Sequence, residues 1–147
     1  MSNTTALYHV VFCTRHRQKT IPLDHREDLY RYIWRCITDH KCKLLRIGGV
    51  ADHVHMLIDL HPTVGLSDLM RAVKANSSGW LRSDPRFDGF DGWGKEYFAS
   101  TIAPKDKSGV IEYIKNQEVH HRARQFDDEL SSLHREAGME LDDRDFR

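Results

Sequence analysis

The chain has 147 residues, 39% of them hydrophobic and 30% charged, which suits one folded domain and excludes a disordered chain of low hydrophobicity and high net charge. No apolar run approaches the ~20 residues that cross a bilayer, and no secretory signal precedes the first predicted strand, so we expect a cytoplasmic protein without a membrane partner. The net charge is zero, but residues 1–125 hold 19 Lys and Arg against 14 Asp and Glu, while residues 126–147 hold 3 against 8, so a nucleic-acid partner for the basic part stays open.

The first 60 residues predict three strands and one helix. Residues 6–13 are rich in β-branched and aromatic side chains, as in a buried strand. Asp24 and Glu27 have the spacing of a helix capping box, and apolar residues then recur at helical spacing to about Asp39. Residues 43–50 and 53–60 are two further strands with a short polar turn between them, so we expect a hairpin.

The second half of the chain predicts two helices and one strand. Ser67 is an acceptable N-cap for a helix, residues 96–103 predict a fourth strand, and a third helix runs from about Gly109 to about Arg124. The order strand, helix, strand, strand, helix, strand is typical of the α+β ferredoxin-like fold, an antiparallel sheet with two helices on one face. The third helix is additional and must pack elsewhere.

Two histidines occupy the third predicted strand. His53 and His55 are separated by one residue, so they point to one face of the strand while the residues between and after them point to the other. Asp59 and His61 continue the histidine face. Two imidazoles on one face can bind a divalent ion together, although a polar pair on a solvent-facing strand is the alternative meaning of the pattern.

A second group of polar residues lies on the third predicted helix. At 100° per residue, Tyr113, Gln117, His120 and Arg124 form one stripe, offset from the isoleucines that should face the core. Tyrosine can act as a nucleophile toward phosphorus, and a glutamine carbonyl oxygen can bind a hard cation. The alternative interpretation is that Tyr113 is an ordinary packing residue and Gln117 is exposed to solvent, with no role in chemistry.

Packing of the third helix across the sheet would bring both groups together. Two histidines and an amide oxygen leave open positions, which Mg²⁺ or Mn²⁺ can fill with phosphate oxygens and water. The ion can then act as a Lewis acid on a phosphodiester while Tyr113 attacks the phosphorus.

These residues carry a resemblance to a known family. The stretch "HVHMLIDL" followed by "YIKNQEVHH" is similar to the single-tyrosine transposases of the HUH endonuclease superfamily, which include insertion-sequence transposases and REP-associated relatives. The resemblance also covers "YHVVFCTRHRQ", "GGVADHVHMLI", "LMRAVKANSSGWL" and "WGKEYFAST". It implies a ferredoxin-like domain that cuts and rejoins single-stranded DNA, often beside hairpins, through a covalent 5′-phosphotyrosine.

The resemblance also assigns roles to residues. His53 and His55 match the metal pair, Gln117 the third ligand and Tyr113 the nucleophile. The common assembly that it implies is a homodimer in which the tyrosine helix of one copy serves the partner's metal site, whereas repeat-associated relatives can act as monomers. We expect residues 1–126 to form the catalytic domain and residues 127–147 an acidic tail with helical potential.

Basic residues from three stretches of the chain are candidates for contact with DNA phosphates. Trp80, Trp93 or His16 could stack on unpaired bases beside them. A lone Lys or Arg is usually a solvated surface residue, so the prediction concerns the set. Its members are Arg15, Arg17 and Lys19 in the first loop, Arg71, Lys74 and Arg82 around the second helix, and Lys105 and Lys107 before the third.

Two other classes of function stay open. In a metal-dependent hydrolase, His53, His55 and His120 or His121 would hold zinc and activate water, and cleavage would survive Tyr113→Phe. A non-catalytic nucleic-acid-binding domain of the RNA-recognition type would need aromatic residues on the sheet, and histidines stand there instead. Nucleic-acid binding unchanged by a chelator would support that class.

Overall fold

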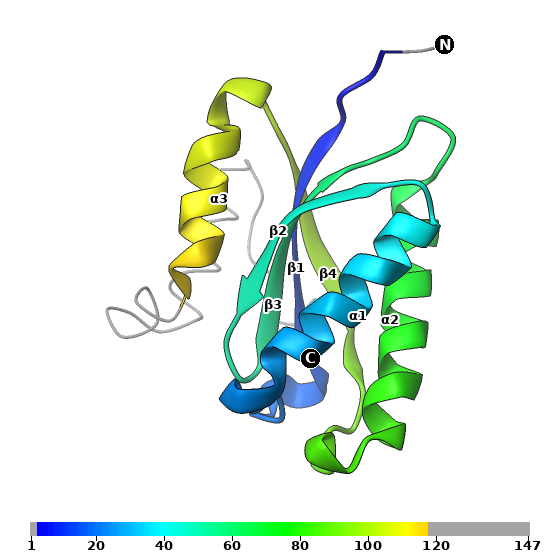
Figure 1. Cartoon of the computed structure of the whole chain (residues 1–147), viewed down its shortest axis with the longest axis vertical. Helices are drawn as coiled ribbons and strands as arrows, with labels where there is room; N and C mark the ends of the chain where they lie inside the picture. Colours follow the sequence, from blue (N-terminus) through cyan, green and yellow to red (C-terminus); the bar gives the residue numbers. More distant parts are fainter. Residues whose placement is uncertain (1–2, 118–147) are drawn as a thin grey trace.

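The computed structural model describes residues 3–117, so the predicted acidic tail lies outside the described residues. The sheet is antiparallel with strand order β2-β3-β1-β4 (Figure 1). This arrangement confirms the predicted α+β ferredoxin-like fold. In chain order the main elements are β1 (Leu7–Thr14), α1 (Arg26–Asp39), β2 (Lys43–Gly49), β3 (His53–Asp59), α2 (Leu66–Ser83), β4 (Trp93–Ile102) and α3 (Lys107–Lys115).

Helices α1 and α2 cover one face of the sheet and enclose the main core. Strands β1 and β3 each direct alternate side chains into this core, among them Val10, Phe12, Val54 and Met56, all at 0% exposure. Complete burial of each such side chain contributes about 1.5–3 kcal/mol. The alternation fixes which side chains of these strands must lie on the opposite face.

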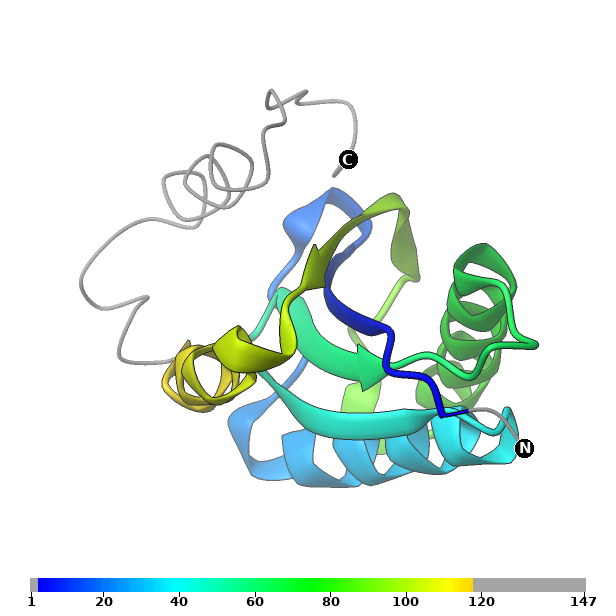
Figure 2. The same cartoon turned by 90° about the horizontal axis from the view of Figure 1, so that it is seen from above.

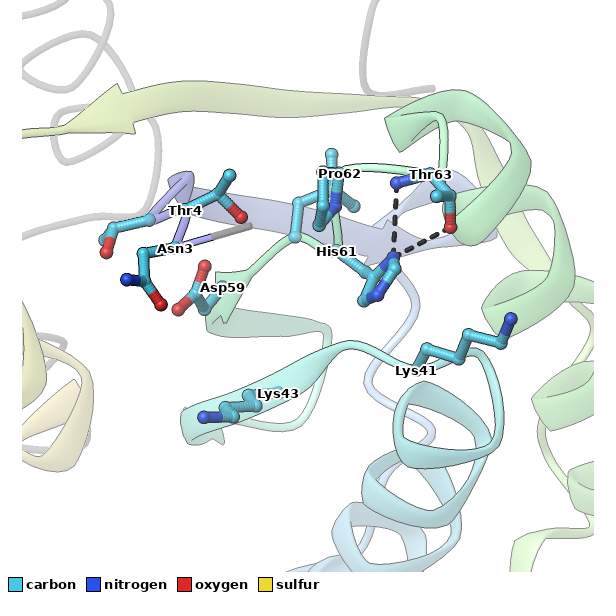
Figure 3. Close-up of a pocket in the computed structure, with 10 residues that line it drawn as sticks. Asn3, Thr4, Lys41, Lys43, Asp59, His61, Pro62 and Thr63 are labelled. Atoms are coloured by element: carbon cyan, nitrogen blue, oxygen red, sulfur yellow. Dashed lines mark hydrogen bonds between the residues drawn. The ribbon is translucent and has the colours of Figure 1, made fainter. Parts of the chain in front are cut away.

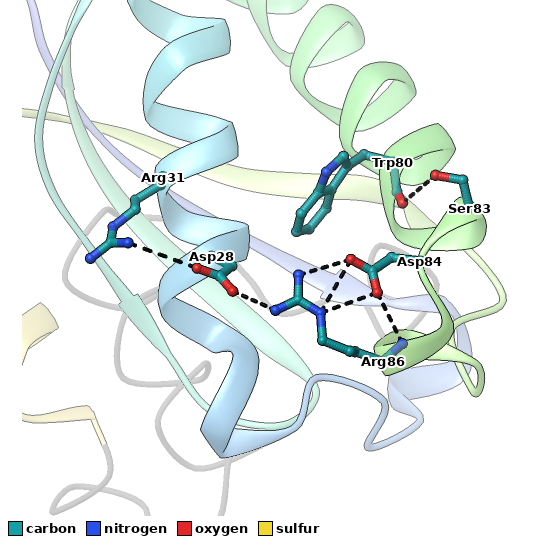
Figure 4. A network of polar contacts seen from close by, with 6 residues as sticks. All are labelled: Asp28, Arg31, Trp80, Ser83, Asp84 and Arg86. Atoms are coloured by element: carbon teal, nitrogen blue, oxygen red, sulfur yellow. Dashed lines mark hydrogen bonds and ion pairs between the residues drawn. The ribbon is translucent and has the colours of Figure 1, made fainter.

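A polar network joins the end of α2 to the beginning of α1 (Figure 4). Arg86 donates hydrogen bonds to both Asp84 and Asp28, which lie on either side of its guanidinium. These hydrogen bonds lower the pKa of Asp84 and raise the pKa of Arg86. The network thus connects the turn after α2 to the first turn of α1.

Helix α3 packs on the face of the sheet opposite α1 and α2, as Figure 2 shows. Its Ile114, at 1% exposure, forms a second small core with Leu7 and Leu57. Gly48 of β2 permits this close approach, because a Cβ atom there would lie 2.7 Å from the carbonyl oxygen of Ile114. None of the described helices is long and apolar enough to span a membrane.

Several predicted boundaries differ from those observed. The predicted capping box is wrong, because Asp24 lies in a 3-10 turn, Leu23–His25, and α1 begins after it without a side-chain cap. Helix α2 begins at Leu66 with Gly65 as its N-cap, one residue before Ser67. Strand β4 begins three residues earlier than predicted, at Trp93, because the chain already pairs there with the end of β1.

Candidate active site

The histidine pair lies near the start of β3, on the face of the sheet opposite the main core. His55 is opposite Val11 of β1 and His53 is opposite Cys13, and both histidines are at 0% exposure. The shared face was predicted correctly. The alternative of a solvent-facing polar pair is wrong, because these imidazoles are removed from water and therefore need polar partners within the protein.

Each histidine of the pair has a specific partner at its Nδ1 atom. The Nδ1 atom of His53 lies 2.7 Å from Oδ1 of Asp52, and the Nδ1 atom of His55 lies 2.9 Å from Nε2 of His9. Histidines that bind metals commonly donate their other ring N–H to such an acceptor, which fixes the tautomer and the ring orientation. With Nδ1 engaged in both rings, Nε2 is the atom of each that can bind an ion.

Helix α3 brings Tyr113 to the pair, and Gln117 follows two residues after the helix ends at Lys115. The Tyr113 ring centroid lies 5.7 Å from that of His55 and 6.0 Å from that of His9. Gln117, one turn later, is at 1% exposure and donates from Nε2 to the Tyr113 carbonyl, 3.3 Å away. Its Oε1 atom is buried and accepts no hydrogen bond from the described part of the chain, an arrangement that typically costs about 1–3 kcal/mol and that a bound cation would relieve.

The donor set fits a divalent cation. Two imidazole nitrogens and one amide oxygen leave room for phosphate oxygens and water around Mg²⁺ or Mn²⁺. Within residues 3–117 there is no group of three or more His, Cys, Asp or Glu that could hold a metal, so among these residues Gln117 is the candidate for a third ligand. His120, His121 and Arg124 lie outside the described residues.

Two residues of this site were missed by the sequence reasoning. His9, at 4% exposure, lies on β1 diagonally across from His55, and Asp52 directly precedes β3. His9 could have been found by the same feature that identified His53 and His55, namely a histidine within an apolar strand. The adjacency of Asp52 to His53 in the sequence was the signal for the second residue.

Asp59 and His61 do not join the histidine pair. They line a separate cavity of about 660 Å³ at the far end of β3, together with Lys41 and Lys43 (Figure 3). His61 directs Nδ1 toward the hydroxyl of Thr63, 2.7 Å away. The length of β3 separates both residues from His53, so they add no ligand to the histidine pair, although alternation places Asp59 on the same face of the strand.

The predicted DNA-contact residues separate into groups in the structure. Arg15, Arg71, Lys74 and Arg82 line one groove between α2 and β4. Arg17 and Lys19 are exposed in the segment after β1. Lys105 and Lys107 are exposed beyond the opposite end of β4, so the whole set does not form one continuous surface.

The three predicted base-stacking residues have different surroundings. Trp93 is a core residue at 7% exposure, and its Nε1 donates to the Ser77 hydroxyl, 2.9 Å away. It cannot stack on a base without leaving the core, so this prediction is wrong. Trp80 stacks on Tyr32 with ring centroids 5.0 Å apart, and His16 is exposed.

Comparison with known proteins gives concordant matches. The sequence profile of the family described as "Transposase IS200 like" matches residues 2–117. The chain is 26% identical over 117 residues to the transposases for insertion sequence element IS200 of Salmonella typhimurium and Salmonella typhi, which covers 75% of this chain and 75% of each relative.

Two solved structures share the fold. A candidate transposase from Deinococcus radiodurans matches with a TM-score of 0.62 and 21% identity, over 79% of this chain and 93% of that one. A REP-associated tyrosine transposase bound to a REP hairpin matches with a TM-score of 0.63 and 16% identity, over 82% of this chain and 74% of that one. The fold, the buried histidine pair and the family profile agree, and the chain belongs to the IS200-like transposase family.

Proposed function

We propose that this transposase cleaves and rejoins single-stranded DNA, with the phenolic oxygen of Tyr113 as the nucleophile. His53, His55 and Gln117 would bind a Mg²⁺ or Mn²⁺ ion, which supplies Lewis-acid polarisation of the scissile phosphate. The observation that carries the proposal is the position of the Tyr113 ring beside the buried ring of His55. Gln117, whose Nε2 bonds to the Tyr113 carbonyl, supports it, because its buried Oε1 atom accepts no hydrogen bond from the described residues.

The covalent step is a transesterification. A bond forms between the Tyr113 oxygen and phosphorus while the bond from phosphorus to the 3′ oxygen breaks, so the phenol loses its proton and the released 3′ oxygen gains one. The products are a 5′-phosphotyrosine and a free 3′-OH. In joining, a 3′-OH attacks that phosphorus and Tyr113 recovers its proton, so no ATP is needed because the phosphodiester energy is retained.

Two further residues of the site, Asp52 and His9, orient its ligands. The Asp52 carboxylate accepts from His53, and His9 accepts from His55 when the proton of that hydrogen bond is on His55. Each contact keeps the proton on Nδ1 and so presents an Nε2 lone pair to the ion.

Hairpin-bearing DNA is the proposed substrate. The REP-associated tyrosine transposase that shares the fold is bound to a REP hairpin, which supports a DNA hairpin as a partner here. The Tyr113 ring lies beside His55 within a single chain, and we propose cleavage within one copy as the arrangement to test first. The homodimer with shared sites stays a prediction.

A denaturing gel tests the mechanism. Wild type and Tyr113→Phe are incubated with hairpin-bearing single-stranded DNA from the flanks of the gene, with Mg²⁺ or with EDTA. We expect a Mg²⁺-dependent covalent adduct in the wild type that is absent in the Phe variant. Cleavage that survives in the Phe variant would reject the tyrosine mechanism in favour of a water-activating hydrolase.

A mixing experiment tests the assembly. Tyr113→Phe and His55→Ala chains, each inactive alone, are combined and assayed for the adduct. If each site works within one copy, the mixture stays inactive, whereas recovered adduct formation would show that the tyrosine of one copy serves the histidines of another.

A further inference from the structure

A groove of about 540 Å³ runs between α2 and the beginning of β4. Five of its lining side chains are basic, and none of the described residues that line it is acidic; the cavity in Figure 3, by comparison, combines two lysines with Asp59. Tyr97, half-buried and packed against the main core, also lines the groove. The five basic residues are Arg15, Arg71, Lys74, Arg82 and Lys95.

Two guanidinium groups converge at one end of this groove. The Nη2 atoms of Arg82 and Arg15 lie 3.0 Å and 3.3 Å from the position that a Cβ atom would take on Gly92. Asp91 compensates them only in part, since its exposed carboxylate lies 3.8 Å from Arg15 and its carbonyl accepts from Arg82 at 3.2 Å. Like charges held this close favour an anion between them, and phosphate oxygens accept well from paired guanidinium groups.

A lysine extends across the middle of the groove. Lys74 Nζ donates to the Lys95 carbonyl of β4, 3.0 Å away. Partial burial lowers the pKa of Lys74, while the nearby Glu96 carboxylate raises it. A phosphate at this position would compensate the desolvation of the ammonium. Along α2 the basic residues extend from Arg71 to Arg82, about 16 Å, which is long enough to follow successive phosphates.

The groove opens at the end of the sheet where the histidine pair begins. The Arg15 N–H donates to the Gly92 carbonyl at 2.8 Å, and the neighbouring Thr14 N–H donates to the Asp52 carbonyl at 2.9 Å. Asp52 in turn contacts His53. The groove lies on the α2 side of the sheet and the histidines on the α3 side, so a strand that leaves the groove reaches the histidines by passing around this end of the sheet.

We propose that the groove binds an unpaired stretch of the DNA strand that leads to the scissile phosphate, with its phosphates on the five basic side chains and one base stacked on Tyr97. Positive charge along a groove with an aromatic wall is the usual combination for single-stranded nucleic acid. The proposal rests on the proposed function for the identity of the strand, but binding in the groove requires neither the metal nor the tyrosine chemistry.

The test therefore measures binding without cleavage. Full-length Tyr113→Phe protein in EDTA is titrated against a fluorescein-labelled, unstructured oligothymidine by anisotropy over a series of salt concentrations. The added groove substitutions are Lys74→Met with Arg82→Gln, and separately Tyr97→Leu. The matched control is Lys43→Met with Arg35→Gln, which removes two exposed charges from β2 and α1, outside the groove and outside the predicted DNA-contact set. Thermal melts verify that each variant is folded.

We expect the groove pair to weaken binding at least tenfold and to reduce the slope of log K against log salt by about 1.4, because each phosphate contact on a single strand contributes about 0.7. Tyr97→Leu should weaken binding at least fivefold with an unchanged salt slope, as loss of stacking does. The control should change neither quantity. Wild-type-like affinity and slope in the folded groove pair, or equal losses in the control pair, would overturn the proposal. Equally tight binding of a duplex of the same length would overturn the unpaired-strand part.

Because the protein carries Tyr113→Phe throughout, these results are independent of the cleavage mechanism. Loss of binding in the groove variants together with no adduct in the gel assay would retain the groove and reject the proposed function. Unchanged binding in the groove variants together with an adduct in the gel assay would retain the proposed function and show that the DNA strand binds elsewhere.

Discussion

Replacement of His9 by Leu tests whether the second histidine contact controls metal binding. The His9 ring, at 4% exposure, is stacked on that of His55 with centroids 5.2 Å apart, and its Nε2 lies 2.9 Å from His55 Nδ1. Leucine fills much of the same volume but cannot accept a hydrogen bond. The proton on His55 is then no longer held on Nδ1, and the Nε2 lone pair needed for an ion is no longer favoured.

The expected size of the effect follows from this geometry. Loss of an orienting partner of a metal-binding histidine typically lowers metal affinity 10–100-fold, or about 1.4–2.7 kcal/mol. The buried N–H of His55 that loses its acceptor should also destabilise the metal-free protein by about 1–3 kcal/mol. In a domain of about this size, each 1 kcal/mol lowers Tm by roughly 3 °C.

Manganese binding provides the assay, since the EPR signal of free Mn²⁺ reports affinity without DNA or activity. Thermal melts in EDTA report the stability change. His9→Gln is the matched control, because its amide oxygen can accept from His55, and we expect its Mn²⁺ affinity to stay within a few-fold of wild type. Wild-type affinity in folded His9→Leu would refute the orienting role, and no Mn²⁺ binding by the wild type would refute the metal site itself.

Three further changes probe the ligand, the helix position and the charge network. Gln117→Ala should lower Mn²⁺ affinity about tenfold in the same EPR titration, while Gln117→Glu restores an oxygen ligand. Gly48→Ala should displace α3 and reduce adduct formation at least tenfold, whereas Gly109→Ala, with nothing within 4 Å of its new Cβ, should not. Asp84→Asn should lower Tm at pH 7. Because the folded pKa of Asp84 is lowered, its stabilising effect is present above the ordinary carboxyl pKa, so the gap from wild type should close as pH falls through the lowered value.

The fold could be predicted from the sequence because its signals are periodic. The alternation of side chains in residues 53–59 corresponds to strand β3, and the helical spacing of apolar residues from Leu29 onward corresponds to helix α1. The residues that mark where a helix begins predicted its boundary less well. The predicted capping box at Asp24 failed because His25 N–H bonds to the carbonyl of Pro22 and the chain forms a 3-10 turn before the helix begins.

The candidate site could be predicted only where its residues lie close in sequence. His53 and His55 share a strand, and Tyr113 and Gln117 are four residues apart at the end of α3, so spacing alone relates each pair. His9 could not be placed beside His55 in the same way, because that contact depends on the β1–β3 register, which pairs Val11 with His55. The convergence of Arg15 and Arg82 likewise depends on where two distant segments end.

The two adjacent glycines of β2 explain how a helix can complete this site. A Cβ on Gly49 would lie 2.2 Å from the His53 carbonyl, so this glycine allows the hairpin that positions the histidine strand. A Cβ on Gly48 would lie 2.7 Å from the Ile114 carbonyl, so this glycine allows α3 to approach the sheet. Both contacts lie between the main chains of neighbouring elements, where a flexible side chain cannot move aside to relieve them. The position of the Tyr113 ring beside His55 therefore depends on close packing between main chains. The large apolar core, which provides most of the stability, lies on the other face of the sheet, so the geometry of the site and the stability of the fold depend on different contacts.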